Sequence, residues 1–152
     1  MKSKRKIGWF GLVFLAVVSA AVLLPACSPA AFEETYNDDA RIAKNSANAT
    51  VEVKSKSILL SDKYTFSADK FSGMKTVKKL DLPADPVFKN VKLTVSEGKF
   101  KVVLVKDGEV YVLTDKDTDG NIETTLAAGQ YTLKIVGVDA KVSLSMGLSE
   151  FA

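Results

Sequence analysis

The stretch KFKVVLVKDGEVYVLTD, residues 99–115, decides the fold that the sequence predicts. Asp107 and Gly108 separate two runs that are rich in β-branched and aromatic residues, and this pair supplies the positive φ angles that a two-residue type I′ hairpin needs. The apolar residues of the first run alternate between two faces, with Phe100, Val102 and Leu104 on one side and Val103 and Val105 on the other. A strand that is apolar on both faces belongs in the middle of a sheet with cover on each side.

The same alternation recurs in five segments elsewhere after Thr50. The alternating apolar residues are Val51 and Val53; Tyr64 and Phe66; Val91, Leu93 and Val95; Tyr131, Leu133 and Ile135; and Val142, Leu144 and Met146. A period of two is typical of strands with one buried face. Turn-forming residues separate the runs, namely Gly73, Pro83, Pro86, Gly98, Gly108, Gly120 and Gly129. We therefore expect about eight or nine strands in one all-β domain, an antiparallel β-sandwich of the immunoglobulin-like or jelly-roll-like kind, with a barrel as the alternative.

One segment resembles a feature of immunoglobulin-like sandwiches. In LAAGQYTLKIVG, residues 126–137, Tyr131 follows a turn and stands two positions before an inward aliphatic residue. The segment is similar to a tyrosine corner, which implies that the phenol hydroxyl of Tyr131 bonds to an upstream backbone group. Alternatively, Tyr131 is a half-buried aromatic residue of a strand.

The amino terminus has the parts of an export signal. MKSKRK is followed by an apolar run over residues 7–26 and by Cys27, the single cysteine of the chain. Leu24, Pro25, Ala26 and Cys27 resemble the lipobox of bacterial lipoproteins, with Pro25 in place of the family's usual small residue.

This resemblance implies cleavage before Cys27 and a diacylglyceryl group on its sulfur. Two acyl chains hold a soluble domain stably at a bilayer, whereas one gives only marginal binding. The alternative is an uncut transmembrane helix, because about 20 apolar residues suffice to span the hydrocarbon core. Both alternatives place the remaining chain on the extracytoplasmic face of the cell membrane or the outer membrane.

The expected organisation has three parts: a signal peptide over 1–26, a lipidated Cys27 with a polar tether over 27–49, and a β-sandwich over 50–152. The tether contains few branched apolar residues, with room for one short helical turn near residues 38–44. A flexible segment of this length would hold the sandwich roughly 25 Å from the lipid.

The charge of the mature chain excludes a general electrostatic argument for nucleic-acid binding. Four of the 21 Lys and Arg residues precede Cys27, which leaves 17 against 18 Asp and Glu residues. A basic stripe or a strongly positive domain is the usual mark of a nucleic-acid partner, and the mature chain has a net charge of about −1. We expect no nucleic-acid partner.

The absence of histidine decides much of the chemistry. Ser-His triads, histidine-bound zinc and imidazole acid–base catalysis are excluded. The sequence also has no nucleophile elbow, P-loop or dinucleotide fingerprint. It therefore predicts a protein that is not an enzyme.

A candidate calcium loop occurs in DKDTDGNIE, residues 115–123. Asp115, Asp117 and Asp119 precede Gly120 with the spacing of the first half of an EF-hand loop, and Glu123 is available to complete a shell. Position 12 is Leu126 rather than the bidentate glutamate, so the pattern breaks there. The alternative is an ordinary solvated turn between strands.

A lysine-rich run forms a second candidate site. Lys75, Lys78 and Lys79 occur in KFSGMKTVKKLDL, residues 70–82. These side chains suit contact with an anionic envelope polymer or lipid headgroups. They equally suit an exposed strand that is protected from pairing with other chains.

Together these features predict a membrane-anchored extracytoplasmic lipoprotein with a non-catalytic binding or accessory module. Its expected partners are membrane lipid, through acylated Cys27, and an envelope polymer or protein. No cofactor is required, although calcium remains possible. The alternatives are a structural or assembly subunit of an envelope complex and a calcium-dependent carbohydrate-binding module.

Overall fold

The computed structural model describes residues 28–44 and 50–151, which form two short helices and seven strands. The elements are α1 (Pro29–Asn37), α2 (Asp39–Ala43), β1 (Val51–Val53), β2 (Lys56–Leu59), β3 (Lys63–Leu82), β4 (Val87–Lys106), β5 (Glu109–Thr114), β6 (Thr118–Glu123) and β7 (Gly129–Gly147). The predicted signal peptide, residues 1–26, and the predicted lipidation site, Cys27, lie outside the described residues. Within the described ranges, no helix is long and apolar enough to cross a membrane.

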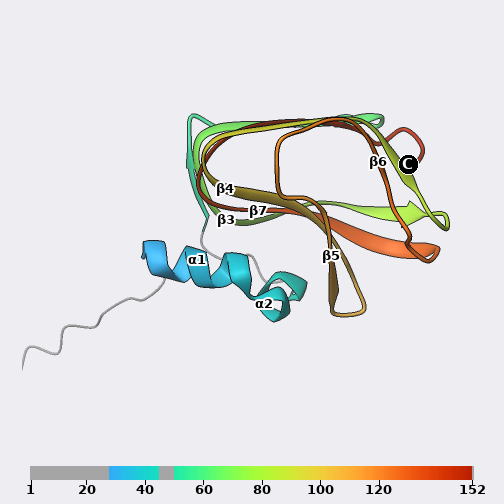
Figure 1. Ribbon diagram of the computed structural model, residues 1–152, viewed down its shortest axis with the longest axis horizontal. Helices are drawn as coiled ribbons and strands as arrows, with labels where there is room; N and C mark the ends of the chain where they lie inside the picture. Colours follow the sequence, from blue (N-terminus) through green and yellow to red (C-terminus); the bar gives the residue numbers. More distant parts are fainter. Residues whose placement is uncertain (1–27, 45–49, 152) are drawn as a thin grey trace, which may run out of the picture.

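The strands form one antiparallel sheet in the order β1-β3-β7-β4-β5, with β2 also paired to β3 and β6 also paired to β4. The long strands β3, β4 and β7 bend partway along, so that the sheet folds over itself (Figure 1). Layer A contains residues 63–68, 87–95 and 142–147 with β2 and β6 at its sides. Layer B contains residues 71–82, 97–106 and 129–140 with β5 at its side. The sandwich-like all-β fold is therefore confirmed.

Bulges and residues with positive φ make the bends. The β3–β7 pairing shifts register within residues 68–73, and the β4–β7 pairing shifts within residues 95–99. A bulge adds an unpaired residue and bends the strand that carries it. Gly98 lies at the bend of β4 with a φ of +71°, and a Cβ there would stand 2.3 Å from the carbonyl oxygen of Val138 on β7. The close approach of these two backbones requires glycine at this position.

The structure has fewer and longer strands than the sequence predicted. Gly73 and Gly98 were expected to mark turns, but they lie inside β3 and β4 at the bends. Each long strand serves both layers, so two expected strands become one. The hairpin prediction is confirmed, since Asp107 and Gly108 join β4 to β5 with φ angles of 52° and 83°.

The main core fills the space between the layers. Phe66, Phe71 and Phe100 pack there, with ring centroids 5.2 to 6.1 Å apart. The predicted inward residues of four segments are buried or packed against this core: Tyr64 and Phe66; Val91, Leu93 and Val95; Tyr131, Leu133 and Ile135; and Val142, Leu144 and Met146. Only β1 departs from the pattern, because Val51 and Val53 are exposed at the bend.

The two faces of the β4 strand match the prediction. Phe100, Val102 and Leu104 belong to the core between the layers, whereas Val103 and Val105 belong to a second cluster on the outer face of layer B. That cluster also contains Met74, Val136 and Ile42. Ile42 comes from α2, so a helix supplies the cover that the doubly apolar strand requires.

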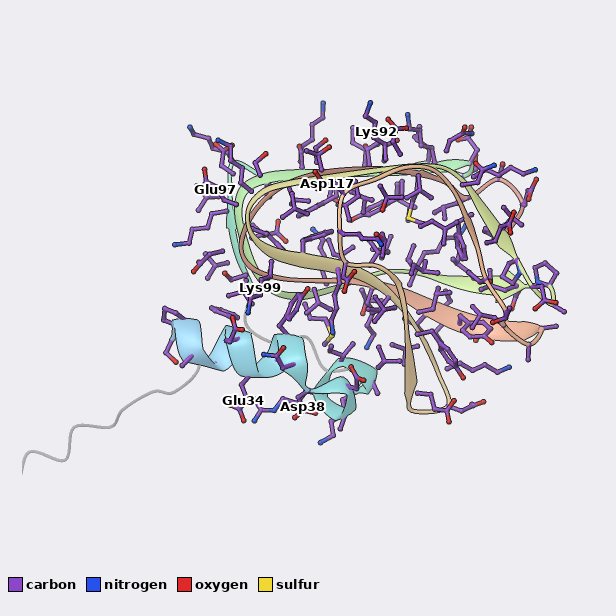
Figure 2. The ribbon with its side chains drawn as sticks, viewed as in Figure 1. Glu34, Asp38, Lys92, Glu97, Lys99 and Asp117 are labelled. Atoms are coloured by element: carbon purple, nitrogen blue, oxygen red, sulfur yellow. The ribbon has the colours of Figure 1, made fainter. Side chains whose placement is uncertain are left out.

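Residues 29–43, expected within a polar tether, form α1 and α2 against layer B, and α2 coincides with the short helical turn expected near residues 38–44. Ser28 caps α1, since its hydroxyl accepts a hydrogen bond from the Ala31 amide, and Pro29 occupies the first turn. Phe32 and Ile42 are buried on the side toward the sheet. Lys99 points from the bend toward α1 (Figure 2), where its Nζ pairs with Glu33. The segment is therefore part of the folded domain.

Candidate binding groove

The predicted calcium residues do not form a cluster. Residues 118–123 form the extended strand β6, in which residues rise about 3.3 Å each. Asp119 and Glu123 are therefore spread along the strand by about 13 Å. Asp117 accepts a hydrogen bond of 2.8 Å from the Val95 amide, and Asp119 pairs with Lys92 at 3.5 Å. Across residues 28–44 and 50–151, no three acidic side chains gather to hold a metal ion.

The three predicted binding lysines have different environments. Lys75 forms an ion pair of 3.2 Å with Glu52 and lies 5.6 Å from the centre of the Phe66 ring. Lys78 and Lys79 follow a bulge in β3, where Lys79 is exposed and Lys78 is half-buried. The ammonium of Lys75 is thus engaged within the protein, and the three side chains do not form one open basic patch.

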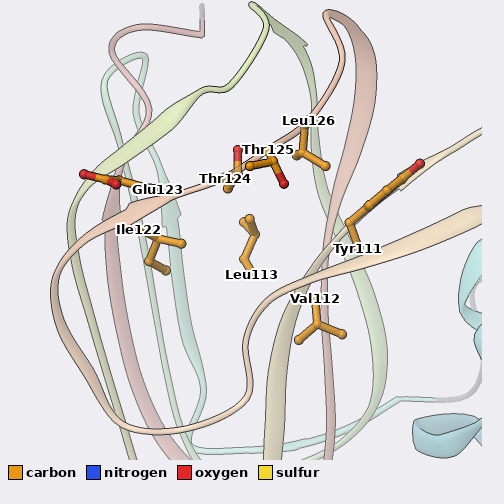
Figure 3. Close-up of a pocket in the computed structure, with 8 residues that line it drawn as sticks. All are labelled: Tyr111, Val112, Leu113, Ile122, Glu123, Thr124, Thr125 and Leu126. Atoms are coloured by element: carbon orange, nitrogen blue, oxygen red, sulfur yellow. The ribbon is translucent and has the colours of Figure 1, made fainter.

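A groove lies between the two layers of the described chain. β5 and β6 both pair with the edge of β4 that faces away from β7, and the space between them opens to solvent. It encloses about 320 Å³ and is lined by Tyr111, Val112 and Leu113 on β5 and by residues 122–126 on the other side. Figure 3 shows these two segments on either side of the opening.

The groove continues along β5 toward the hairpin. An adjoining cavity of about 250 Å³ shares Tyr111, Thr125 and Leu126 with the first and extends to Lys106 and Tyr131. Leu113 and Ile122 are half-buried and pack against the core, so the floor is apolar. We use the name edge groove for both cavities together.

Backbone hydrogen bonds hold the wall opposite β5 in place. The Tyr131 hydroxyl donates to the Ala127 carbonyl at 2.8 Å, which confirms the upstream bond expected of a tyrosine corner. The Thr124 hydroxyl donates to the Pro86 carbonyl at 2.8 Å, and the Asp85 amide donates to the Leu126 carbonyl at 2.8 Å. These bonds tie residues 124–127, which have no regular secondary structure, to fixed parts of the sandwich.

The edge of β5 presents backbone polar groups to the groove. In an antiparallel hairpin with a two-residue turn, Lys106 and Glu109 exchange hydrogen bonds, and alternate residues after Glu109 direct their N–H and C=O groups away from the partner strand. These residues are Val110 and Val112. Val112 also has a side chain that is 51% exposed. Within the described chain, β5 ends the sheet on this side.

Acidic groups predominate around the edge groove. Its lining includes the carboxylates of Asp107, Glu109 and Glu123 and one ammonium, that of Lys106. Lys106 Nζ donates to the Ala128 carbonyl at 3.1 Å and lies 5.0 Å from the centre of the Tyr131 ring. This arrangement favours a ligand that carries positive charge.

Tyr111 is tied to one of these carboxylates. Its hydroxyl donates to Glu109, and this hydrogen bond raises the pKa of the Tyr111 phenol to about 12. The phenol therefore stays protonated over the physiological range and keeps the Glu109 carboxylate in a defined position at the groove.

Sequence reasoning did not find the edge groove. Its two walls lie on β5 and on residues 122–126, and only the bending of β4 places them face to face. One signal was available in EVYVLT, which is a run of high β-propensity with no lysine or proline to protect an exposed edge.

Comparisons of the chain with protein-family models, with curated proteins and with solved structures found no match.

Proposed function

We propose that the protein is a lipoprotein held by acylated Cys27 on the extracytoplasmic face of a cell membrane or outer membrane, where its sandwich is a non-catalytic binding module. The edge groove is the proposed binding site. The anchor rests on the basic and apolar leader and on the residues 24–27 that resemble a lipobox. The binding role rests on the groove.

The proposed binding function rests on one observation. Two strands that end the sheet, β5 and β6, lie on either side of a cavity whose floor reaches the apolar core. Proteins usually protect such edges with charges, bulges or a covering segment, because open edges pair with other chains. An apolar cavity with a few polar groups is the usual form of a ligand site, and here it lies beside an open sheet edge.

A non-catalytic role fits the groups that line the groove. The chain has no histidine to act as a base at neutral pH. The Thr124 hydroxyl is bonded to a backbone carbonyl, and Glu109 accepts a hydrogen bond from Tyr111. These side chains determine the shape and charge of the groove wall, which supports a role in ligand binding.

The anchor is tested by the chemistry of Cys27. We expect the mature protein to begin at a diacylated Cys27 in mass spectra and to sediment with membranes. Cys27→Ala should leave the leader uncut and abolish incorporation of labelled palmitate. An unmodified, unprocessed amino terminus on protein recovered from the cytosol would contradict the proposal.

The binding site is tested in intact cells with a photo-reactive amino acid. We expect the reactive group at Val112 to give a discrete adduct with an envelope component. Val53 is a matched control, because it is also an exposed valine on a short strand but lies at the bend. Equal labelling from both positions, or none from Val112, would show that the groove is not the site.

A further inference from the structure

We propose that the ligand of the edge groove is an extended peptide segment that adds to β5 as a new strand, with apolar residues at its centre and basic residues at its ends. This inference rests on the proposed binding function and names the partner class for the same site.

The backbone of β5 has unpaired polar groups on its outer edge. Val110 and Val112 direct their N–H and C=O groups outward, about two residues apart, which is the spacing that a partner strand satisfies. In the described chain, no other segment bonds to these groups. Addition of a strand to an exposed edge is a recurring mode of peptide recognition, in which main-chain hydrogen bonds supply affinity.

β5 differs from the other short strands in the length of its uncharged run. β1 has Glu52 at its centre, β2 begins with Lys56, and β6 carries Asp119 and Gly120. Charges and glycines of this kind discourage pairing with another chain. β5 also begins with a charge, Glu109, and its pairing with β4 shifts register near Leu113, but its residues 110–114 are all uncharged. Among the short strands of the described chain, β5 therefore has the longest uncharged run, which favours it as the edge that pairs.

The groove beside β5 can accept apolar side chains from an added strand. Residues of an added strand would alternate between the inner and outer faces of layer B. Those on the inner face would enter the cavity above Leu113, Ile122 and Leu126, which form an apolar floor. A peptide with apolar residues at alternate positions would close the open side of the sandwich.

The charge of the edge groove favours a basic peptide. The groove has three carboxylates and one ammonium, and that ammonium is bonded to the Ala128 carbonyl. A basic residue near each end of the peptide would meet these carboxylates. Pairing of β5 with a second copy of itself would bring two acidic rims together, which opposes association. A separate basic partner is therefore favoured over a homodimer.

The tyrosine rings of the edge groove are not arranged to stack on a carbohydrate. Stacking on carbohydrate needs an open ring face, but Tyr131 is buried and Lys106 lies over its ring at 5.0 Å. Tyr111 meets Tyr131 edge-on, with centroids 5.9 Å apart. This packing favours a peptide over a polysaccharide.

The test uses the mature protein and the synthetic peptide Lys-Val-Thr-Val-Thr-Val-Lys, acetylated and amidated at its ends. We expect calorimetry to detect binding, and hydrogen exchange to show protection of the Val110 and Val112 amides. The peptide with glutamate in place of both lysines should bind at least about tenfold more weakly. Methylation of alternate backbone nitrogens, on the edge that faces β5, should abolish binding.

Val112→Pro tests the backbone hydrogen bond that the Val112 N–H would donate to the peptide. The N–H of Val112 is not used in the ladder with β4, so proline removes an outward donor and is tolerated at an edge. Val112→Thr keeps the N–H and is the control. We expect proline to weaken peptide binding at least about tenfold and threonine to change it severalfold less. The methylated peptide gives the same test without any change in the protein.

The outcomes of these experiments distinguish failure of the peptide inference from failure of the proposed binding function. If Val112 forms its adduct in cells but the basic peptide neither binds nor protects β5, the ligand is of another class and the peptide inference is wrong. If both experiments fail, the proposed function is wrong as well. If sedimentation shows a dimer that Val112→Pro dissociates, the occupant is a second copy, which also overturns the inference.

Discussion

Gly98 and Gly108 require glycine for different reasons, the first mainly steric and the second conformational. Gly98 and Gly108 both have positive φ, but a Cβ at Gly98 would meet backbone atoms of β7 at 2.3 Å, whereas a Cβ at Gly108 would have no neighbour within 4 Å. We expect Gly108→Ala to lower the free energy of unfolding by about 1 kcal/mol, for backbone conformation alone. Gly98→Ala should lower it by about 3 kcal/mol or more. Urea unfolding measures both, and equal losses would show that the bend tolerates a side chain.

The phenol of Tyr111 gives a pH-dependent prediction. Its pKa is raised to about 12 from an ordinary value of 10.0 by the hydrogen bond to Glu109. Because the folded state holds this proton more tightly, the stabilising effect is complete below about pH 10 and is lost as the pH rises through about 12. We expect Glu109→Gln to lower the pKa of Tyr111 in a tyrosine-resolved NMR titration. An unchanged pKa would show that the carboxylate is not the cause.

At the scale of elements, Lys134 connects the helices to the sheet. Its side chain is fully buried, and its Nζ donates to the carbonyls of Ile42 at 2.7 Å and Lys44 at 2.9 Å, at the end of α2. Lys134→Met keeps an apolar stem of similar length but removes both donors. We expect amide exchange within residues 39–43 to become at least about tenfold faster, while β4 and β7 keep their protection.

The control for this prediction is Lys79→Met, since Lys79 is an exposed lysine on β3. It should leave exchange in α2 unchanged. Burial also lowers the pKa of Lys134, so the folded state binds this proton less tightly than the unfolded chain. The free energy of unfolding should therefore rise with pH between the lowered pKa of the folded state and about 10.5, and Lys134→Met should reduce that slope. Unaltered exchange in α2 would show that apolar packing alone holds the helix.

Most strands, but not their lengths, could be predicted from the sequence. The period of two located the inward residues of β3, β4 and β7, and Asp107-Gly108 located the hairpin, because these are local properties of the backbone. The bends could not be predicted, since Gly98 looks like a turn residue until β7 is known to lie against it. The edge groove depends on two segments that meet only after bending. The helices had a visible start signal in Ser28-Pro29, but their cover of Met74 and Val103 is a tertiary contact.

For the whole molecule, the docked helices change the geometry of the proposed anchor. Cys27 directly precedes the capping residue of α1, and α1 begins near the bent end of the sheet (Figure 1). On the proposed anchoring, the lipid would be attached next to the folded domain rather than at the end of a long spacer. The edge groove is lined by β5 and residues 122–126, and β5 lies nearer to α2 than to the start of α1 (Figure 1), so the anchor and the groove would occupy different parts of the domain.

The role of residues 28–49 is tested by comparing a chain that begins at Ser28 with one that begins at Thr50. A flexible spacer could be removed without loss. The structure predicts a loss, because deletion uncovers Met74, Val103 and Val136 and leaves the buried Lys134 without its carbonyl acceptors. Burial of one Ile or Phe side chain is worth roughly 1.5 to 3 kcal/mol, so we expect the shorter chain to be less stable by about 3 kcal/mol.

Urea unfolding of the two chains measures this difference directly. The shorter chain should also bind a hydrophobic dye on its uncovered face, whereas the longer one should not. Ile42→Ala in the longer chain is an intermediate case, since it leaves the backbone acceptors of Lys134 in place but removes a fully buried side chain. We expect its stability to fall between the two. Equal stability of all three chains would mean that the sandwich is complete without its helices and that residues 28–49 are a spacer after all.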